Sequence, residues 1–363
     1  MRGTQLSLES IESLNAMDDE SFQMELLEGV SRTFALTIPQ LPESLCKAVA
    51  NAYLLCRIVD TIEDEVSITA EQKKYFCHGF INIVRTCKNS EAFSTELAPL
   101  LSSSTLPAEH VLIHVIPRVI RITHQFDEEQ VAALSSCIET MAEGMPIFQA
   151  ENLHDGLDKL ADMDRYCYYV AGCVGEMLTK LFCHHSLEIA AHRDEMLDLA
   201  VSFGQGLQMT NILKDIWDDA ERGVCWLPQD VFSEVGYDLK NLSAKSNDAN
   251  FRIGLERLIS IAHGHLQNAL KFTQLIPGHE IGIRNFCLWA LGMAVLTLKK
   301  IKQNLGFTQS NDVKISRNSV KSTILATKLI GRHNRLLTLL FNFIGQGLLV
   351  HDWTYSPQIA KQR

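Results

Sequence analysis

Proline is scarce in this chain, and so is the apolar and polar alternation typical of strands. Only nine prolines occur among 363 residues, and none lies between Pro146 and Pro228 or between Pro277 and Pro357. Proline disrupts helix interiors, so each of these intervals can hold several uninterrupted helices. Apolar residues there recur at three- and four-residue steps, for example Met196, Ala200, Phe203 and Leu207. This spacing predicts helices with one buried face.

Three further features are missing. The formal net charge of −10 comes with no basic stripe, which excludes a nucleic-acid partner, because phosphate backbones are bound by clustered cations. Ten cysteines include no Cys-x-x-Cys pair, and residues 1–9 lack the apolar core of a signal peptide. We therefore expect reduced thiols and a cytoplasmic protein, and no protein partner is evident.

The remaining composition is that of a large globular domain. Hydrophobic residues make up 46% and charged residues 21%, which excludes a disordered chain. No solenoid repeat, low-complexity linker or change in composition marks a boundary. The sequence predicts a single all-α domain over residues 1–363 with roughly ten or more helices.

Two acidic clusters are the most informative feature that is present. Residues 60–64 read Asp-Thr-Ile-Glu-Asp, and residues 215–219 read Asp-Ile-Trp-Asp-Asp. Positions i, i+3 and i+4 share a helix face, so each cluster groups three carboxylates, which would repel one another without a cation. Oxygen ligands of this kind suit Mg²⁺ shared with a phosphate-bearing substrate. The predicted metal ligands are Asp60, Glu63, Asp64, Asp215, Asp218 and Asp219.

The ordinary interpretation of such clusters is a solvated helix face. The flanking residues argue against it here. Both clusters end strongly apolar segments, and each has a cation just upstream, since Arg57 precedes Asp60 by three residues and Lys214 is next to Asp215. Carboxylates, cations and amides on largely apolar helices favour the lining of a cavity.

The C-terminal region contains another strongly apolar stretch. We expect a helix over about 334–351, too short and too interrupted to span a membrane, which takes about twenty apolar residues. A core helix is slightly favoured. Peripheral contact with a membrane surface is the functional alternative.

Four segments together resemble the squalene and phytoene synthase family, whose members join two prenyl diphosphates head to head. They are Ser31-Arg32-Thr33-Phe34, the cluster 60–64, the aromatic segment 166–175 (YCYYVAGCVG) and residues 211–219 followed by Trp226-Leu227-Pro228. The order and spacing match the family, and the resemblance spans about residues 31–320, within a motif-bearing core of about 25–320. It implies an all-α isoprenoid-synthase bundle around a central cavity.

Two later segments resemble squalene synthases in particular. Phe286-Cys287 and the helix after it resemble the segment lining the second half-reaction, and Val313-Lys314-Ile315 resembles the motif that holds NADPH phosphate. Two departures are clear, since Ala290-Leu291 stand where Pro-Gln is common, and Ser316 stands at a usually basic position beside Arg317. They affect reductant binding more than the first half-reaction.

The resemblance implies an Mg²⁺-dependent transferase that condenses two farnesyl diphosphates to presqualene diphosphate and reduces it with NADPH to squalene. A phytoene or dehydrosqualene synthase without reductant is the alternative within the family. A catalytically silent helical binding factor is the alternative outside it, although all six acidic positions are intact.

Roles for individual residues follow from the same resemblance. Tyr166 is expected to act on the diphosphate or in proton transfer, together with Asp60, Asp64, Asp215 and Asp219 as catalytic carboxylates. NADPH would contact Asn211, Lys314 and Arg317. The glycines Gly172 and Gly175 fit equally well as close helix contacts or as room for a prenyl chain. The expected substrate-binding residues are Ser31, Arg32, Phe34, Tyr53, Arg57, Tyr169, Gln208, Asn211, Lys214 and Phe286.

Overall fold

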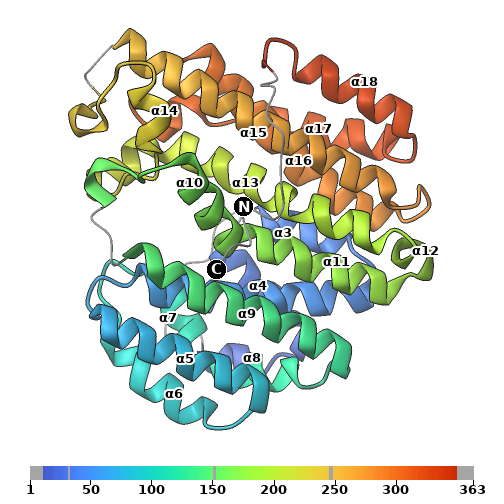
Figure 1. The fold of residues 1–363 in the computed structure, drawn as a ribbon. Helices are drawn as coiled ribbons and strands as arrows, with labels where there is room; N and C mark the ends of the chain where they lie inside the picture. The colour runs from blue at the N-terminus through green and yellow to red at the C-terminus, as the bar shows by residue number, and fades with distance from the viewer. Residues whose placement is uncertain (1–10, 32, 150–152, 245–247, 350–363) are drawn as a thin grey trace. The chain divides into compact units, whose positions relative to one another are not determined.

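The computed structural model describes residues 11–31, 33–149, 153–244 and 248–349. These residues form helices joined by short turns, and within them the only β pairing is an isolated bridge between Leu157 and Pro228. The predicted all-α class is therefore confirmed. Figure 1 shows the helices coloured along the chain.

The chain divides into two compact units, and whether they act as the predicted single domain stays a prediction. The first unit comprises Met1–Ala150 and Lys180–Leu187. Its core helix α4 packs against α2 and α9, and α5 packs against α9. The elements are α1 (Ile11–Asn15), α2 (Asp19–Val30), α3 (Phe34–Thr37), η2 (Ile38–Gln40), α4 (Glu43–Asp64), α5 (Ala70–Thr86), α6 (Ser90–Leu97), η3 (Ala98–Leu100), α7 (Pro107–His114), α8 (Ile116–Thr123) and α9 (Glu128–Gln149).

The second unit comprises Glu151–Thr179 and Glu188–Arg363. Its long helix α13 packs against α15 and α16, and α16 packs against α17. Helix α11 passes from this unit into the first. The elements are η4 (Leu153–Asp155), α10 (Leu160–Cys167), the π-helical turn η5 (Tyr168–Gly172), α11 (Cys173–His185), α12 (Leu187–Ala190), α13 (Arg193–Glu221), α14 (Gln229–Ser233), η6 (Leu239–Asn241), α15 (Ala249–Leu275), α16 (Ile281–Gln303), η7 (Ser310–Val313), α17 (Arg317–Ile330) and α18 (Asn334–Ile344).

Local sequence explains where the long helices begin and which faces they bury. Asp248 caps α15 by accepting hydrogen bonds from the backbone N–H groups of Asn250 and Phe251. On α13, the predicted apolar stripe is buried at Met196, Ala200 and Phe203 and half-buried at Leu207. The three- and four-residue periodicity therefore reports the packed face of this helix correctly.

Helix α18 is shorter than the expected 334–351. It ends at Ile344, and Gly345 caps it through a backbone hydrogen bond to the carbonyl of Phe341. Gly347 then adopts a φ of 92°, which glycine tolerates and helices do not. Residues 350 and 351 of the expected helix lie outside the described residues.

One helix, α16, is long and apolar enough to cross a membrane by length and composition. Residues along its length are buried inside the protein, including Ile283, Leu288, Leu291 and Leu298. The helix therefore has the character of a core helix.

Candidate active site

The first acidic cluster lies at the C-terminal end of α4. The Asp60 side chain is 25% exposed and Asp64 is exposed, one helical turn further on. Glu63 differs, because it is only 6% exposed and lies near Lys73 of α5. Burial lowers the pKa of Lys73, and the negative charge of Glu63 acts in the opposite direction. Asp60 and Asp64 are thus the two carboxylates of this cluster that a ligand can reach.

Arg57 lies beside this cluster, as its position three residues before Asp60 predicts. Its Nη1 is 3.7 Å from Oδ2 of Asp60, and its Nη2 pairs with Glu109 of α7. The Nε donor of Arg57 is buried and has no hydrogen-bond partner among the described residues. A substrate oxygen that accepted this hydrogen bond would satisfy it.

Sequence reasoning missed Glu109, which is 7% exposed and separated from Arg57 by fifty-two positions. Its other carboxylate oxygen accepts a hydrogen bond from the backbone N–H of Leu106 at 3.2 Å. Glu109 therefore anchors the guanidinium of Arg57 from the start of α7. No local pattern in the sequence marks this residue.

Burial raises the pKa of Asp60 to about 7, while the neighbouring Arg57 acts in the opposite direction. The nearby Asp64 carboxylate adds to the increase. The ionised form of Asp60 is thus costly without further positive charge. A bound divalent cation would supply that charge, so the electrostatics of this end of α4 fit a metal ligand.

The N-terminal segment packs on the same helix. The rings of Phe34 and Tyr53 lie 5.0 Å apart between centroids. Ser31 accepts a hydrogen bond from the backbone N–H of Phe34 at 3.1 Å, which holds the start of α3. Burial raises the pKa of the Tyr53 phenol, so this group stays neutral. Arg32, the remaining predicted residue of this segment, lies outside the described residues.

The second acidic cluster occupies the last turns of α13. Gln208, Asn211, Asp215 and Asp218 follow one another at steps of three and four, so they form one polar stripe on this helix. Asn211 and Asp218 are exposed, and Gln208 and Asp215 are half-buried. The expected grouping of amides and carboxylates on one face is present.

Each carboxylate of this cluster has a different partner. Asp215 receives both of its hydrogen bonds from Lys214, at 2.7 and 2.5 Å. Asp218 accepts a hydrogen bond from Ser310 of η7 at 2.7 Å. Asp219 pairs with Arg222, and burial raises the pKa of Asp219 against the opposing effect of that arginine.

No three His, Cys, Asp or Glu side chains within the described residues come close enough together to form a complete metal site. Mg²⁺ is usually held by one or two carboxylates and completes its octahedron with water and substrate phosphates, so it does not require a cluster of three. The pair Asp60 and Asp64 offers such a partial site on α4. On α13, Asp215 and Asp219 stand four residues apart and are the expected second pair, although Asp219 is only 8% exposed and pairs with Arg222.

Tyr166 lies in the last turn of α10 and is 6% exposed. Its ring stacks on Trp226 with centroids 3.8 Å apart and planes 12° apart. The helix then changes to a π-helical turn over Tyr168–Gly172 before α11 begins. Such turns are rare and are frequent at functional sites. Tyr169 lies within this turn, half-buried, and its ring is 5.5 Å from that of Tyr168.

Glycines on η5, α11 and α13 allow the backbones of these elements to pack closely. A Cβ on Gly175 would overlap the carbonyl oxygen of Ala200, and one on Gly204 would overlap the carbonyl oxygen of Ala171. A Cβ on Gly172 would lie 2.9 Å from the Tyr168 ring and 3.2 Å from Val201. Of the two interpretations left open by the sequence, these contacts favour close helix packing.

The residues expected to serve the reductive step lie on α16 and near η7. Phe286 is 6% exposed on α16, next to Asn285, whose buried amide oxygen has no partner among the described residues. Lys314 follows η7 and Arg317 begins α17, and both are exposed. Lys314 donates a weak hydrogen bond to Asn311 at 3.3 Å, which leaves its ammonium largely available.

Comparison with known proteins identifies the family and similar curated members of it. The family model described as squalene/phytoene synthase matches residues 27–319. The chain is 28% identical to a squalene synthase of Eremothecium gossypii over 84% of this chain and 67% of that protein. It is 29% identical to a squalene synthase of Saccharomyces cerevisiae, over 84% of this chain and 66% of the relative. The chain thus spans about two thirds of the length of these curated relatives.

A solved structure gives the same result for the fold. The complex of TcSQS with a ligand superposes with a TM-score of 0.75 at 23% identity, over 94% of this chain and 95% of the other. The helical fold is therefore shared along nearly the whole of both chains. Because the family model covers most of the sequence, the chain belongs to the squalene/phytoene synthase family.

Proposed function

We propose that this protein is a squalene synthase that condenses two farnesyl diphosphates to presqualene diphosphate and reduces this intermediate with NADPH. The observation that carries the proposal is the similarity to curated squalene synthases across 84% of the chain. Two helix ends that each present a pair of carboxylates beside a cation support it.

The carboxylates Asp60, Asp64, Asp215 and Asp219 would hold Mg²⁺, with Asp218 and the more buried Glu63 in support. Bound Mg²⁺ would neutralise the negative charge that develops on the departing diphosphate. Arg57 and Lys214 would donate hydrogen bonds to the diphosphate oxygens, since Arg57 has an unsatisfied Nε donor and the Lys214 ammonium already lies among the carboxylates. Ser31 and Arg32 would contact the same group.

Aromatic side chains would line the path of the carbocation. Phe34, Tyr53, Tyr169 and Phe286 offer ring faces that stabilise positive charge without acting as nucleophiles. Tyr166 would move the proton lost on ring closure or assist the leaving diphosphate, because its ring is held by Trp226. Gln208 and Asn211 would position the substrate on the polar stripe of α13.

NADPH would supply the hydride of the second half-reaction. We assign its phosphate groups to Lys314 and Arg317, and its nicotinamide end to the neighbourhood of Asn211. The exposure of both cations supports this assignment, as does the hydrogen bond from Ser310 to Asp218, which joins the η7 segment to α13. We place the enzyme in the cytoplasm, in peripheral contact with a membrane, where a hydrocarbon product can leave.

The decisive experiment incubates purified protein with farnesyl diphosphate and Mg²⁺, with and without NADPH, and identifies the hydrocarbon. We expect squalene only when NADPH is present. An identical product with and without NADPH would replace this proposal with a dehydrosqualene or phytoene synthase. Complete inactivity of folded protein with prenyl diphosphates would favour a binding role instead.

A further inference from the structure

A pocket of about 450 Å³ lies where the C-terminal end of α15 meets the turn between α17 and α18. All of its lining residues belong to the second unit, and none of them is a residue of the candidate active site. Three arginines and one glutamate line it, in a chain whose formal net charge is −10. The pocket is therefore a basic site on an acidic protein. Its titratable lining residues are Glu188, His192, Arg284, Arg332, His333 and Arg335.

Arg284 of α16 carries a positive charge that has no acidic partner among the described residues, although it is only 1% exposed. Its three hydrogen bonds all go to neutral acceptors. They reach the carbonyl of Gly331 at 2.6 Å, the carbonyl of Ile276 and the amide oxygen of Asn334. Burial lowers the pKa of Arg284, because the cation loses its hydration. Buried charges are ordinarily compensated by an opposite charge, and an anion in this pocket would provide one.

The walls of the pocket are held together by hydrogen bonds between α15 and the start of α18. Nε2 of Gln274 donates to the hydroxyl of Thr338 at 2.8 Å, and Nδ2 of Asn334 donates to the carbonyl of Gln274 at 3.0 Å. The backbones also approach closely, because a Cβ on Gly278 would lie 2.9 Å from the carbonyl oxygen of Arg332. The cationic side chains are thus mounted on a frame that forms without a ligand.

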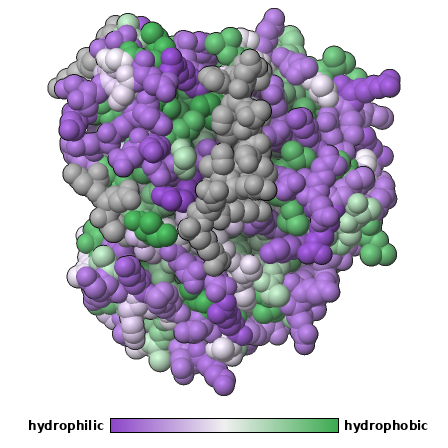
Figure 2. Space-filling model, viewed as in Figure 1, coloured by the Kyte–Doolittle hydropathy of each residue, from purple (hydrophilic) through white to green (hydrophobic). Residues whose placement is uncertain are grey.

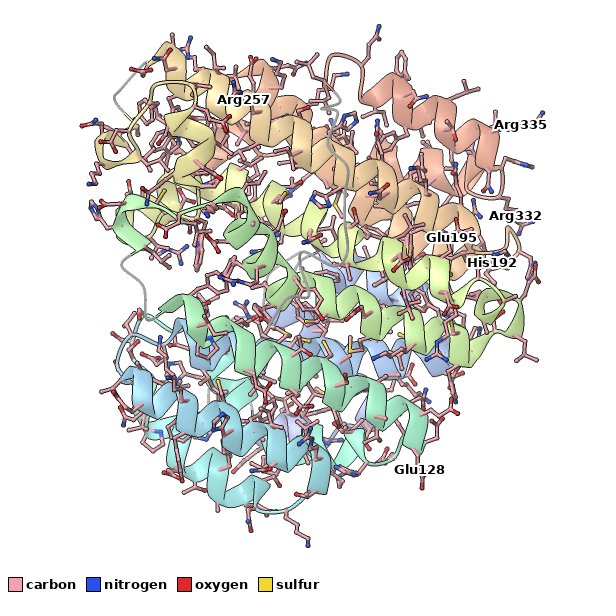
Figure 3. All side chains as sticks on the ribbon, in the orientation of Figure 1. Glu128, His192, Glu195, Arg257, Arg332 and Arg335 are labelled. Carbon is pink, nitrogen blue, oxygen red and sulfur yellow. The ribbon has the colours of Figure 1, made fainter. Side chains whose placement is uncertain are left out.

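Arg332 and Arg335 are exposed, and neither forms an ion pair or a side-chain hydrogen bond within the described part of the chain. Hydrophilic residues predominate on the face drawn in Figure 2, so exposed cations alone would mark no site. Other exposed arginines are neutralised, as Arg257 is by Glu234 at 2.9 Å. In Figure 3, Arg332, Arg335 and His192 lie along one margin of the molecule, away from Arg257. The unpaired arginines are therefore gathered at this pocket.

The N-terminus of α18 adds backbone donors at the same place. Its N-cap residue, His333, makes no side-chain hydrogen bond to the first turn, so the N–H groups of that turn stay available. The positive end of a helix favours anions, and the planar fork of arginine matches the oxygens of phosphate. The one acidic lining residue, Glu188, lies 3.6 Å from His279 and is thus partly neutralised when that histidine is protonated.

We propose that this pocket binds a small soluble anion that carries a phosphate or diphosphate group. Arg332 and Arg335 hold the phosphate oxygens, and the ligand's negative charge compensates the buried charge of Arg284. A volume of about 450 Å³ lies within the range of small-molecule sites. The site is separate from the diphosphate position assigned to Arg57 and Lys214. Because the anion bridges segments of the folded chain, its binding also stabilises the fold.

The test titrates the full chain with inorganic diphosphate by calorimetry, at constant ionic strength and with EDTA in place of Mg²⁺. We expect saturable binding and a rise in the thermal unfolding temperature. The double variant Arg332→Ala with Arg335→Ala should lower the affinity at least about tenfold, because two charged contacts to phosphate are removed. Glu188→Gln should raise the affinity about threefold, because it removes the one negative charge of the pocket lining.

Arg257→Ala with Lys240→Ala is the matched control, because it removes two exposed positive charges of the same unit outside the pocket. It should bind diphosphate as the unchanged protein does. The proposal fails if the unchanged protein does not bind diphosphate, if the Arg332 and Arg335 variant binds it equally well, or if the control loses as much. Circular dichroism establishes that each variant is folded. No prenyl substrate or Mg²⁺ is present, so the outcome does not depend on the proposed enzyme activity.

Discussion

Ser310 donates a hydrogen bond of 2.7 Å to Oδ2 of Asp218, across ninety-two positions of the sequence. A second bond, from Nε1 of Trp217 to the carbonyl of Phe307, also measures 2.7 Å and holds the same segment. The η7 segment before Lys314 is therefore tied to the second acidic cluster. Under the proposed function, the segment that holds reductant and the carboxylates of α13 belong to one connected structure.

Replacing Asp60 or Asp215 by Asn keeps the shape of the side chain and removes its charge. We expect the rate of presqualene diphosphate formation at saturating Mg²⁺ to fall at least about a hundredfold for either variant. Asp198→Asn, at an exposed position of α13, is the control and should retain full activity. Normal turnover by Asp60→Asn or Asp215→Asn would disprove the metal assignment.

Tyr166→Phe removes one hydroxyl and preserves the ring that stacks on Trp226. Thermal stability should be nearly unchanged, while turnover of farnesyl diphosphate falls about tenfold or more, as for the loss of an acid–base group. Tyr169→Phe serves as the comparison and should have a smaller effect. Full activity of Tyr166→Phe would leave this tyrosine with a packing role alone.

Loss of Lys314 and Arg317 together should affect only the reductive step. We expect the double alanine variant to raise the apparent KM for NADPH about tenfold or more, because two charged contacts to phosphate are removed. Presqualene diphosphate or unreduced products should accumulate, with farnesyl diphosphate consumption little changed. Lys240→Ala, at another exposed lysine, is the control. An unaltered KM in the double variant would reject this binding site.

Glu65 should make stability dependent on acid pH. Its carboxylate accepts hydrogen bonds from Ser67 at 2.8 Å, Ser102 at 2.9 Å and Thr105 at 2.6 Å. These bonds outweigh the effect of burial and lower the pKa of Glu65 from 4.5 to about 2. The unfolded chain therefore takes up the proton first as pH falls, and the stability present above pH 4.5 is lost as pH falls toward 2.

Glu65→Gln should flatten this dependence, and it should lower the free energy of unfolding at neutral pH by about 2 kcal/mol. Urea unfolding of both proteins between pH 2 and 7 measures the effect. Equal slopes against pH in the two proteins would show that other groups control acid stability.

Gly175→Ala should destabilise the protein, because its new Cβ would overlap the carbonyl oxygen of Ala200 and force α11 away from α13. We expect a loss of about 2 kcal/mol or more in the free energy of unfolding. Gly79→Ala is milder, since the nearest atom there is a ring carbon of Phe93 at 3.2 Å. Equal stability of Gly175→Ala and the unchanged protein would contradict the close packing.

Much of this protein was determined by local sequence. The helix-forming periodicity, the shared face of Asp60 and Asp64, and the polar stripe from Gln208 to Asp218 all follow from the geometry of a single helix. The family resemblance added the expected roles of Tyr166 and Lys314. These features depend on neighbours a few residues apart, so the sequence displays them directly.

Only the tertiary structure decided which partner each charged or aromatic group has. The anchoring of Arg57 by Glu109, the hydrogen bond from Ser310 to Asp218 and that from Arg284 to Gly331 have no local signal. The burial of Glu63 beside the accessible Asp60 and Asp64 is equally invisible in the sequence. The physical reason is that helical period defines faces of a helix, whereas packing between distant segments defines which of those faces water, ligand or membrane can reach.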